Sequence, residues 1–255
     1  MRSVILVPML FASAILSFPS ADVEGQETRE SLQIYYEFTP RPTAARAFEA
    51  AMWRHGEARR AEGDPWNWGV FQTIAGDNIG DFYAVTAGHR WADLDTYDAN
   101  FGSRGSLYYF SDDVLATVDS VASMIQIRNE EILRLPDSTW PAQLYSLTIY
   151  HLLPDMEDEF WSVMRDVHRA VVDGDYPIRY LFYLPASGAV RPQVIGVSFY
   201  QNWAGRAEPD PVSMGDLLRR TYGEEQAEAL ADRYSRTIRS TENMILVRRA
   251  PESLR

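Results

Sequence analysis

The sequence repeats itself at a spacing of 112 residues. Identical residues recur at this spacing, in the same order in both halves, in the following pairs: Pro42 and Pro154, Phe48 and Phe160, Met52 and Met164, Pro65 and Pro177, Gly76 and Gly188, Val85 and Val197, and Trp91 and Trp203. A period of this length is too long for a solenoid and predicts a duplicated domain. We therefore expect two similar halves, residues 31–136 and 143–250, that share one core with a cleft between them.

The N-terminal residues have the pattern of a secretory signal peptide. One positive charge at Arg2 precedes a mostly apolar run from Val4 to Phe18, and Pro19-Ser20-Ala21 follows. The run has about 15 residues, fewer than the ~20 that a bilayer-spanning helix needs. We expect residues 1–21 to form a signal peptide, cleaved after Ala21 or after Gly25, and the protein to be secreted or periplasmic, with a retained N-terminal anchor as the alternative.

Composition excludes several kinds of site and partner. The chain has no cysteine, which excludes disulfides, iron–sulfur clusters, thiolate zinc sites and cysteine nucleophiles. Its net charge of -12 argues against nucleic acid or an anionic membrane surface as a partner. There is also no glycine-rich phosphate loop and no GxSxG nucleophile elbow. A small-molecule ligand remains as the expected partner, with no membrane contact after signal cleavage.

Hydrophobic periodicity and turn residues predict the same elements in both halves. The first half reads as a strand from Ser31 to Thr39, a helix from Pro42 to Gly63, a hairpin of Trp66–Ile74 and Asp81–Ala87, a helical region from Trp91, a helix from about Asp112 to Gln126 and a strand from Glu130 to Leu135. The second half reads as a strand Leu144–His151, a helix Pro154–Val172, a hairpin of Tyr176–Leu184 and Val194–Tyr200, helices Met214–Tyr222 and Glu224–Ser240, and a strand Met244–Arg248. This is the ferredoxin-like β-α-β-β-α-β order, twice.

Each predicted sheet has helices on one face only, so its other face must be covered. In the first strand Leu32, Ile34, Tyr36 and Phe38 alternate with Gln33, Tyr35 and Glu37. Aligning the first strands at a spacing of 113 would place Gln33 and Ser146 on the same face. Burying apolar area stabilises by about 25 cal/mol per Å². We therefore expect an α+β fold in which the two sheets face each other, with the helices outside.

This pattern resembles the dimeric α+β barrel superfamily, which includes antibiotic-biosynthesis-monooxygenase-like and NIPSNAP-like domains. The resemblance is carried by the strand–proline–helix entry from Tyr36 to Pro42, the hairpin at Gly76, and Trp91-Ala92-Asp93-Leu94-Asp95, which Trp203-Ala204-Gly205 echoes. Single-domain members dimerise to form the barrel. The resemblance implies that two domains in one chain build it internally, as a monomer or weak homodimer.

The resemblance also implies haem as a possible cofactor, because several branches bind it through a histidine on the second long helix of a domain. The four histidines are His55, His89, His151 and His168, and none lies in residues 103–126 or 212–240. We therefore expect no cofactor. We also expect no metal, because Asp155, Asp158 and Glu159 near His151 fall in the first turn of a helix, where carboxylates meet the helix dipole.

Candidate ligand-binding residues lie in the aromatic run and on the open sheet faces. Cofactor-free monooxygenases of this superfamily place Trp, Asn, Tyr and Arg around an aromatic substrate, and Trp66, Asn67, Tyr83 and Arg179 match these types. Tyr35, Glu37 and Trp68 complete the candidate set. The alternative is that the aromatic residues simply fill the barrel.

Glu37 is the charged residue in an otherwise apolar and aromatic strand. If it points inward, its pKa rises unless an arginine pairs with it, and Arg134 and Arg248 are the expected partners. If it reaches the rim, it is only a solvated residue.

Two functions remain open on this sequence. The first is an exported protein that binds a small apolar or aromatic ligand in the cleft between its sheets. The second is a cofactor-independent monooxygenase-like enzyme acting on an aromatic compound. No catalytic residue is assigned. An open cavity with convergent polar groups favours an enzyme, whereas a barrel filled with side chains favours a structural role.

Overall fold

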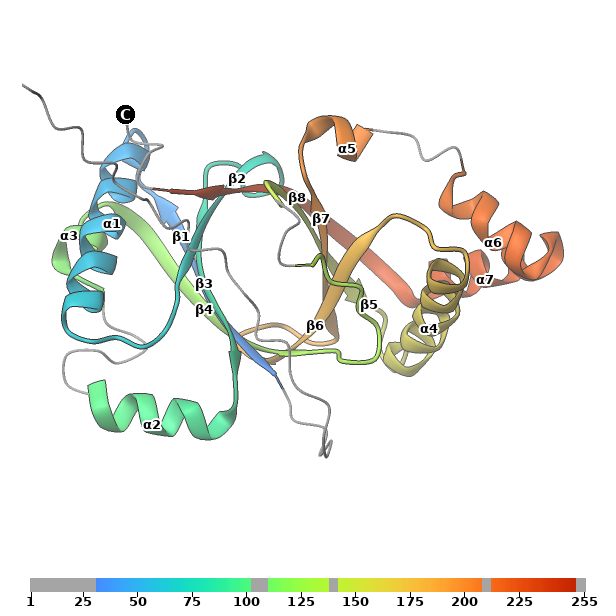
Figure 1. Cartoon of the computed structure of the whole chain (residues 1–255), viewed down its shortest axis with the longest axis horizontal. Helices are drawn as coiled ribbons and strands as arrows, with labels where there is room; N and C mark the ends of the chain where they lie inside the picture. Colours follow the sequence, from blue (N-terminus) through green and yellow to red (C-terminus); the bar gives the residue numbers. More distant parts are fainter. Residues whose placement is uncertain (1–30, 102–109, 138–141, 208–211, 251–255) are drawn as a thin grey trace, which may run out of the picture.

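Eight antiparallel strands close into one barrel in the computed structural model, which describes residues 31–101, 110–137, 142–207 and 212–250 (Figure 1). The order around the barrel is β1-β3-β2-β8-β5-β7-β6-β4. The strands are β1 (Leu32–Pro40), β2 (Gly69–Gly76), β3 (Phe82–His89), β4 (Val118–Arg128), β5 (Leu144–Leu152), β6 (Arg179–Ser187), β7 (Gln193–Tyr200) and β8 (Ile238–Arg249). The predicted α+β barrel within one chain is confirmed, and the expected signal peptide, residues 1–21, lies outside the described residues.

Each half supplies four strands in the ferredoxin-like order, β4-β1-β3-β2 and β8-β5-β7-β6. The halves join at two seams, β2 with β8 and β4 with β6. The helices are α1 (Ala45–Ala61), α2 (Trp91–Phe101), α3 (Asp112–Leu115), α4 (Glu157–Asp173), α5 (Trp203–Ala207), α6 (Met214–Tyr222) and α7 (Glu224–Thr237). Figure 1 shows α1, α2 and α3 on one side of the barrel and α4, α6 and α7 on the opposite side.

Strand register follows the internal repeat. Tyr35 of β1 lies opposite Val85 of β3, and 112 positions later Leu147 lies opposite Val197. Gln33 lies opposite Ala87, and 112 positions later Tyr145 lies opposite Phe199. Tyr145, not Ser146, is therefore equivalent to Gln33, and the expected alignment of the first strands at a spacing of 113 was wrong. Between the fourth strands of the two halves, β4 and β8, the spacing is 120 residues, since Tyr35 lies opposite Met124 and Leu147 lies opposite Met244. The extra residues of the second half thus lie between β7 and β8, in the segment that holds α5, α6 and α7.

The fourth strand of the first half is not where the sequence placed it. A strand occupies Val118–Arg128, where most of a helix was expected, and the helix is reduced to Asp112–Leu115. The expected strand Glu130–Leu135 contributes a single bridge, from Arg134 to Tyr180. The physical reason is that β4 is hydrogen-bonded on both edges, to β1 and to β6, and this pairing outweighs a local helical pattern.

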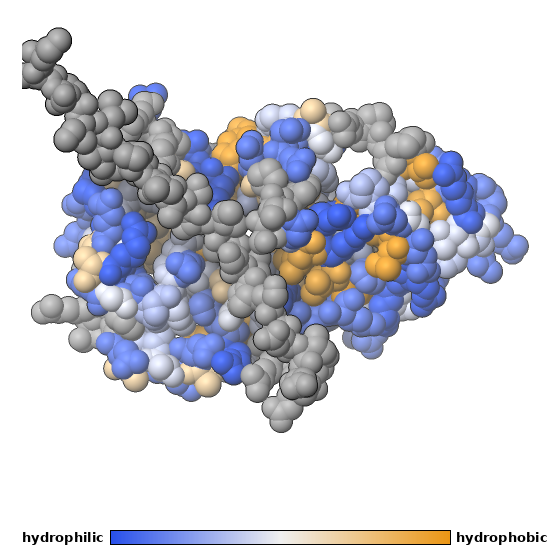
Figure 2. Space-filling model, in the orientation of Figure 1, coloured by the Kyte–Doolittle hydropathy of each residue, from blue (hydrophilic) through white to orange (hydrophobic). Residues whose placement is uncertain are grey.

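Two separate cores lie between the barrel and its helices. In the first half Phe48 of α1 packs on Phe38 and Phe82, with ring centroids 5.1 and 4.8 Å apart. In the second half Phe160 of α4 lies against Tyr150 of β5, with a centroid distance of 5.4 Å. The face shown in Figure 2 is mostly hydrophilic where it is coloured, with orange confined to separate patches. Because the helices cover the outward faces of the strands, the inward faces line the interior of the barrel.

Candidate functional site

The interior of the barrel, together with its extension over the rim, forms a cavity of about 2340 Å³. Inward side chains of all eight strands line it, and it continues over the rim at Asn67 and His89 toward α1. Tyr35, Leu147 and Val197 point into it and remain only partly buried, although each sits in the middle of a strand. The barrel is therefore hollow, not filled with side chains.

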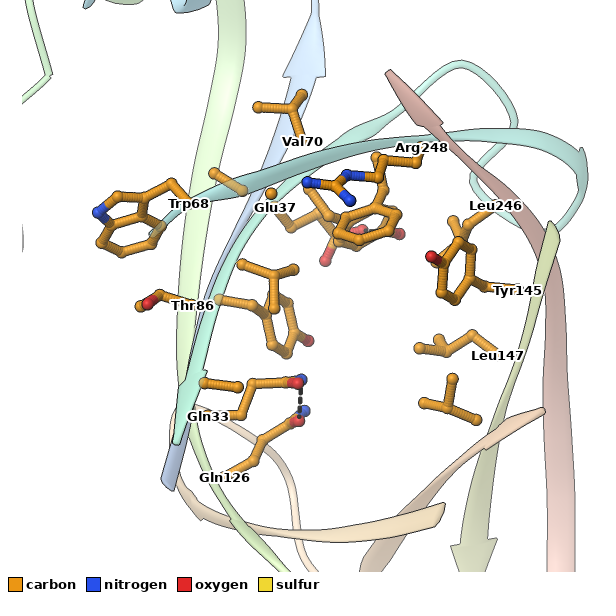
Figure 3. Close-up of a pocket in the computed structure, with 18 of the residues that line it drawn as sticks. Gln33, Glu37, Trp68, Val70, Thr86, Gln126, Tyr145, Leu147, Leu246 and Arg248 are labelled. Atoms are coloured by element: carbon orange, nitrogen blue, oxygen red, sulfur yellow. Dashed lines mark hydrogen bonds between the residues drawn. The ribbon is translucent and has the colours of Figure 1, made fainter. Parts of the chain in front are cut away.

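The two halves contribute walls of different chemistry. The first half presents polar groups at Gln33, Tyr35, Glu37, Tyr83 and Gln126. The equivalent positions of the second half hold Tyr145, Leu147, Ile149, Ile195 and Leu246, which are apolar except for one phenol. Figure 3 shows Gln33 and Gln126 on one side of the cavity, facing Leu147 and Tyr145 across it. A ligand in this space would meet hydrogen-bonding groups on one face and an apolar surface on the other.

Glu37 is the acidic group of the polar wall. The Tyr83 hydroxyl donates a hydrogen bond of 3.0 Å to Glu37 Oε1, and Asn78 Nδ2 donates one of 3.3 Å to the same oxygen. Burial raises the pKa of Glu37, with Asp81 and Glu242 adding to the rise, and the hydrogen bonds from Tyr83 and Asn78 offset only part of it. Burial also raises the pKa values of Tyr83 and Tyr35. Glu37 thus faces the interior. Of the two alternatives drawn from the sequence, the inward-pointing carboxylate is found, and not the solvated residue at the rim.

Neither arginine proposed as a partner from the sequence pairs with Glu37. Arg134 donates to the Tyr176 carbonyl and lies 2.5 Å from Asp175 Oδ1. Arg248 lines the opposite part of the wall, where its charge acts on Tyr145. A phenol and an amide, in place of a guanidinium, therefore hold the Glu37 carboxylate.

A pair of amides forms the second polar feature of this wall. Gln33 Nε2 donates to Gln126 Oε1 over 2.9 Å, and Gln126 Nε2 donates to Met124 Sδ over 3.2 Å. Gln126 is 1% exposed. Sequence reasoning missed it because residues 112–126 were assigned to a helix, whereas the alternation of Met124, Gln126 and Arg128 in a strand would have placed it inside.

The structure separates the predicted ligand-binding residues. Tyr35, Glu37 and Tyr83 line the interior of the barrel. Trp66 borders only the extension of the cavity toward α1, stacked on His89 and Tyr97 with ring centroids 4.0 and 3.9 Å away. Figure 3 shows Trp68 pointing away from the interior, and its ring lies 5.9 Å from the outward-facing Tyr36. The two tryptophans therefore lie on the helix side of the sheet and border the cavity only in its extension toward α1, and both precede β2, which begins at Gly69.

The remaining two candidates lie at the edges of the cavity. Asn67 is exposed at its rim. Arg179 starts β6 opposite Phe199 and donates to the Ile178 carbonyl, and it is not among the residues that line the cavity. The set of Trp66, Asn67, Tyr83 and Arg179 suggested by the resemblance is thus not assembled around one point.

One further polar pair borders the cavity, and sequence reasoning did not find it. His151 Nε2 lies 2.7 Å from Glu242 Oε1.

In the described ranges no group of three or more histidine, aspartate or glutamate side chains is arranged to hold a metal ion. Across those same ranges, no helix is long and apolar enough to cross a membrane.

The described residues do not fit a haem held by a helix histidine. Helices α6 and α7 contain no histidine. All four histidines have neighbours of their own: His55 packs on Phe110, His89 bonds Thr86, His151 bonds Glu242 and His168 bonds Tyr180.

Comparison with known proteins gives a fold and no closer relative. No family model matches the chain, and no curated protein sequence matches it. Among solved structures, the chain is similar to an anthrone oxidase-like protein, with a TM-score of 0.54 and 12% identity over 88% of this chain and 93% of that chain. It is also similar to a chlorite dismutase candidate, with a TM-score of 0.52 and 11% identity over 88% of this chain and 97% of that chain. A monooxygenase candidate from Fusobacterium nucleatum gives a TM-score of 0.51 and 10% identity over 87% of this chain and 93% of that chain.

At these identities the likeness concerns the fold alone. The closed eight-stranded barrel, the two ferredoxin-like halves and these neighbours agree with one another. The chain therefore has the fold of the dimeric α+β barrel superfamily, with both halves of the barrel in one polypeptide.

Proposed function

We propose that the barrel interior binds a small, mainly apolar or aromatic molecule. The observation that carries this proposal is the hollow interior itself, about 2340 Å³ with its rim extension and lined by aliphatic and aromatic side chains on one wall and a few polar groups on the other. Ligand sites of proteins have this composition, in which apolar area supplies affinity and few polar groups fix orientation. A barrel with a purely structural role would be filled by its own side chains.

A neutral fluorescent probe tests this proposal. N-phenyl-1-naphthylamine should bind the purified protein with a rise in its emission. Leu147→Trp places a larger ring in the cavity and should weaken binding roughly tenfold, the cost of about 1.4 kcal/mol in affinity. Val172→Trp, at an exposed position of α4, is the matched control and should leave binding unchanged. Equal affinity in all three proteins, or no binding to the wild type, would refute the proposal.

A cofactor-independent oxygenase is the second candidate, and the raised pKa of Glu37 favours it. A carboxylate with a raised pKa is a stronger base than an ordinary one and is suited to general-base catalysis. Glu37 would take a proton from a C–H or O–H group of a bound aromatic compound. Dissolved O2 would then accept electrons from the resulting anion as a C–O bond forms, and Glu37 would return the proton to give a hydroperoxide. Its O–O bond would break with loss of water, which leaves a carbonyl group on the product. Two of the solved structures with this fold are an anthrone oxidase-like protein and a monooxygenase candidate.

Oxygen consumption distinguishes the two functions. If the protein is an oxygenase, it should consume O2 with anthrone as substrate. Glu37→Gln should then lower kcat by about 100-fold or more, the usual effect of losing a general base. Glu62→Gln, on the surface after α1, is the control. Binding of N-phenyl-1-naphthylamine without any O2 uptake would leave the binding function and reject the enzymatic one.

A further inference from the structure

Four inward side chains form a row across four neighbouring strands. Glu37 of β1 lies opposite Tyr83 of β3, Tyr83 lies opposite Phe71 of β2, and Phe71 lies opposite Arg248 of β8. Adjacent strands are about 4.8 Å apart, so the two ends of the row are separated by about 14 Å along the wall. The row therefore runs from a carboxylate, over two aromatic rings, to a guanidinium.

Both ends of this row have capacity for a ligand. Tyr83 and Asn78 donate to Glu37 Oε1, and no described residue donates to Glu37 Oε2. Arg248 is exposed at the mouth and forms no ion pair with a described residue, whereas its neighbour Arg249 is paired with Glu49. Figure 3 shows the Arg248 side chain extending over the cavity. Among the described residues, the mouth thus offers an arginine without an ion-pair partner, and the wall further along offers a carboxylate oxygen without a donor.

The equivalent row in the other half has neither feature. It consists of Ile149, Ile195, Tyr183 and Arg128. Isoleucines replace the acid and the phenol. Arg128 is bound to Glu130 through Nε–Oε1 and Nη2–Oε2 contacts of 2.9 and 3.0 Å. The two-ended row is therefore specific to one wall and does not follow from the repeated fold.

Resting on the proposed binding function, we propose that the ligand is an elongated aromatic carboxylate with a hydroxyl group at its far end. Its carboxylate pairs with Arg248, since a guanidinium binds a carboxylate through two parallel hydrogen bonds. Its ring system lies against Phe71 and Tyr145, which meet edge-on at a centroid distance of 5.0 Å. Its hydroxyl donates to Glu37 Oε2. The apolar wall around Leu147 covers the other face of the rings.

Three naphthalene probes separate the two ends. The first, 6-hydroxy-2-naphthoate, has both groups, 2-naphthoate lacks the hydroxyl, and 2-naphthol lacks the carboxylate. Fluorescence titration of the wild type should give the tightest binding for 6-hydroxy-2-naphthoate. Arg248→Met should weaken both carboxylates by roughly tenfold and leave 2-naphthol unchanged. Glu37→Ile, which installs the residue found in the other half, should weaken the two hydroxyl compounds and leave 2-naphthoate unchanged.

Arg128→Met is the matched control, because it removes the arginine at the equivalent position, which is already bound to Glu130. It should change none of the three affinities. Circular dichroism verifies that each variant is folded, and Glu37→Gln replaces Glu37→Ile if the latter is not. Equal effects of Arg248→Met and Arg128→Met, or an effect of Arg248→Met on 2-naphthol, would overturn the inference. Binding of N-phenyl-1-naphthylamine without any preference for a carboxylate would overturn it while leaving the proposed function intact.

Discussion

Gly76 and Gly188 are two repeated residues whose identity the structure explains. Both have positive φ, at 90° and 87°. A Cβ at Gly76 would lie 2.0 Å from the Asn243 carbonyl oxygen, and one at Gly188 would lie 2.2 Å from that of Ser123. Each glycine therefore lets a hairpin approach the fourth strand of the other half, so its place in the repeat reflects closure of the barrel.

These contacts predict a difference between glycines of similar backbone conformation. Gly80 has a φ of 96°, and a Cβ added there would meet nothing within 4 Å, so Gly80→Ala should cost only the backbone strain, about 1–2 kcal/mol. Gly76→Ala and Gly188→Ala add a collision with backbone and should each cost on the order of 4 kcal/mol. Urea denaturation measures the three values. Similar losses in all three variants would show that conformation alone, not close approach, selects glycine.

At the residue scale, the sequence predicted which side chains point into the barrel wherever a strand was assigned correctly. It failed where the strand was assigned wrongly. The alternation in β1 placed Gln33, Tyr35 and Glu37 on one face, because a two-residue period fixes facing whatever the partner strand is. Trp66 and Trp68 were expected inside because the strand was started too early. The row ending at Arg248 could not be found, since it depends on the register between β2 and β8, which lie about 170 residues apart in the sequence.

At the scale of elements, helix α1 of the first half is tied to strand β8 of the second. Arg249 binds Glu49 through Nε–Oε1 and Nη2–Oε2 contacts of 2.9 and 3.0 Å, and Glu49 is 3% exposed. Removing Glu49 leaves the partly buried Arg249 without this carboxylate, which is more costly than losing a surface pair. This pair thus couples the helix layer of one half to the seam between the halves.

Glu49→Gln should therefore lower the free energy of unfolding by about 2–3 kcal/mol. The matched control is Asp113→Asn, because Asp113 and Arg54 form a pair in which both side chains are largely exposed. Its effect should stay within about 0.5 kcal/mol. The double variant Glu49→Gln with Arg249→Met should cost less than the sum of its single changes. Additive losses would mean that the two side chains stabilise the protein independently.

Helix α1 also makes stability depend on pH. Burial, together with Arg59, lowers the pKa of His55 to about 4. The unfolded chain binds this proton near pH 6.5, so the unfolded state gains protons first and stability falls between about pH 6.5 and pH 4. His55→Leu removes this contribution. The difference in unfolding free energy between pH 7 and pH 4.5, measured in urea, should be smaller than in the wild type.

His89 and His168 remain in the His55→Leu variant. Burial lowers their pKa values as well, so part of the pH dependence should persist. A wild-type pH dependence in His55→Leu would show that the proton uptake occurs elsewhere.

Element boundaries were predictable only where local and tertiary preferences agree. Helix α4 was predicted within a few residues, since its apolar positions face one core and Gly174 follows its last residue. Strand β4 was taken for a helix because its two partners, β1 and β6, come from both halves of the chain. Neither partner is visible in the local pattern that was used to assign it.

At the scale of the whole molecule, closure depends on the two seams between the halves. Each half alone would leave its second and fourth strands with an unpaired edge and would expose its inward face. The seams differ little in kind, since β2–β8 and β6–β4 are equivalent antiparallel pairs. The walls that they bring together differ strongly, because Gln33, Glu37 and Gln126 of the first half correspond to Tyr145, Ile149 and Leu246 of the second.

Separating the halves should therefore give two fragments that prefer each other. Residues 31–137 and 142–250, made separately, should each self-associate, because a second copy can cover the open edges and the inward face. A homodimer of the first fragment would place two copies of Glu37 in one interior, where burial already raises the pKa of a single copy. Mixing should thus yield a 1:1 complex, detected by light scattering, that regains binding of N-phenyl-1-naphthylamine. Fragments that stay monomeric and folded after mixing would show that each half is stable without the barrel.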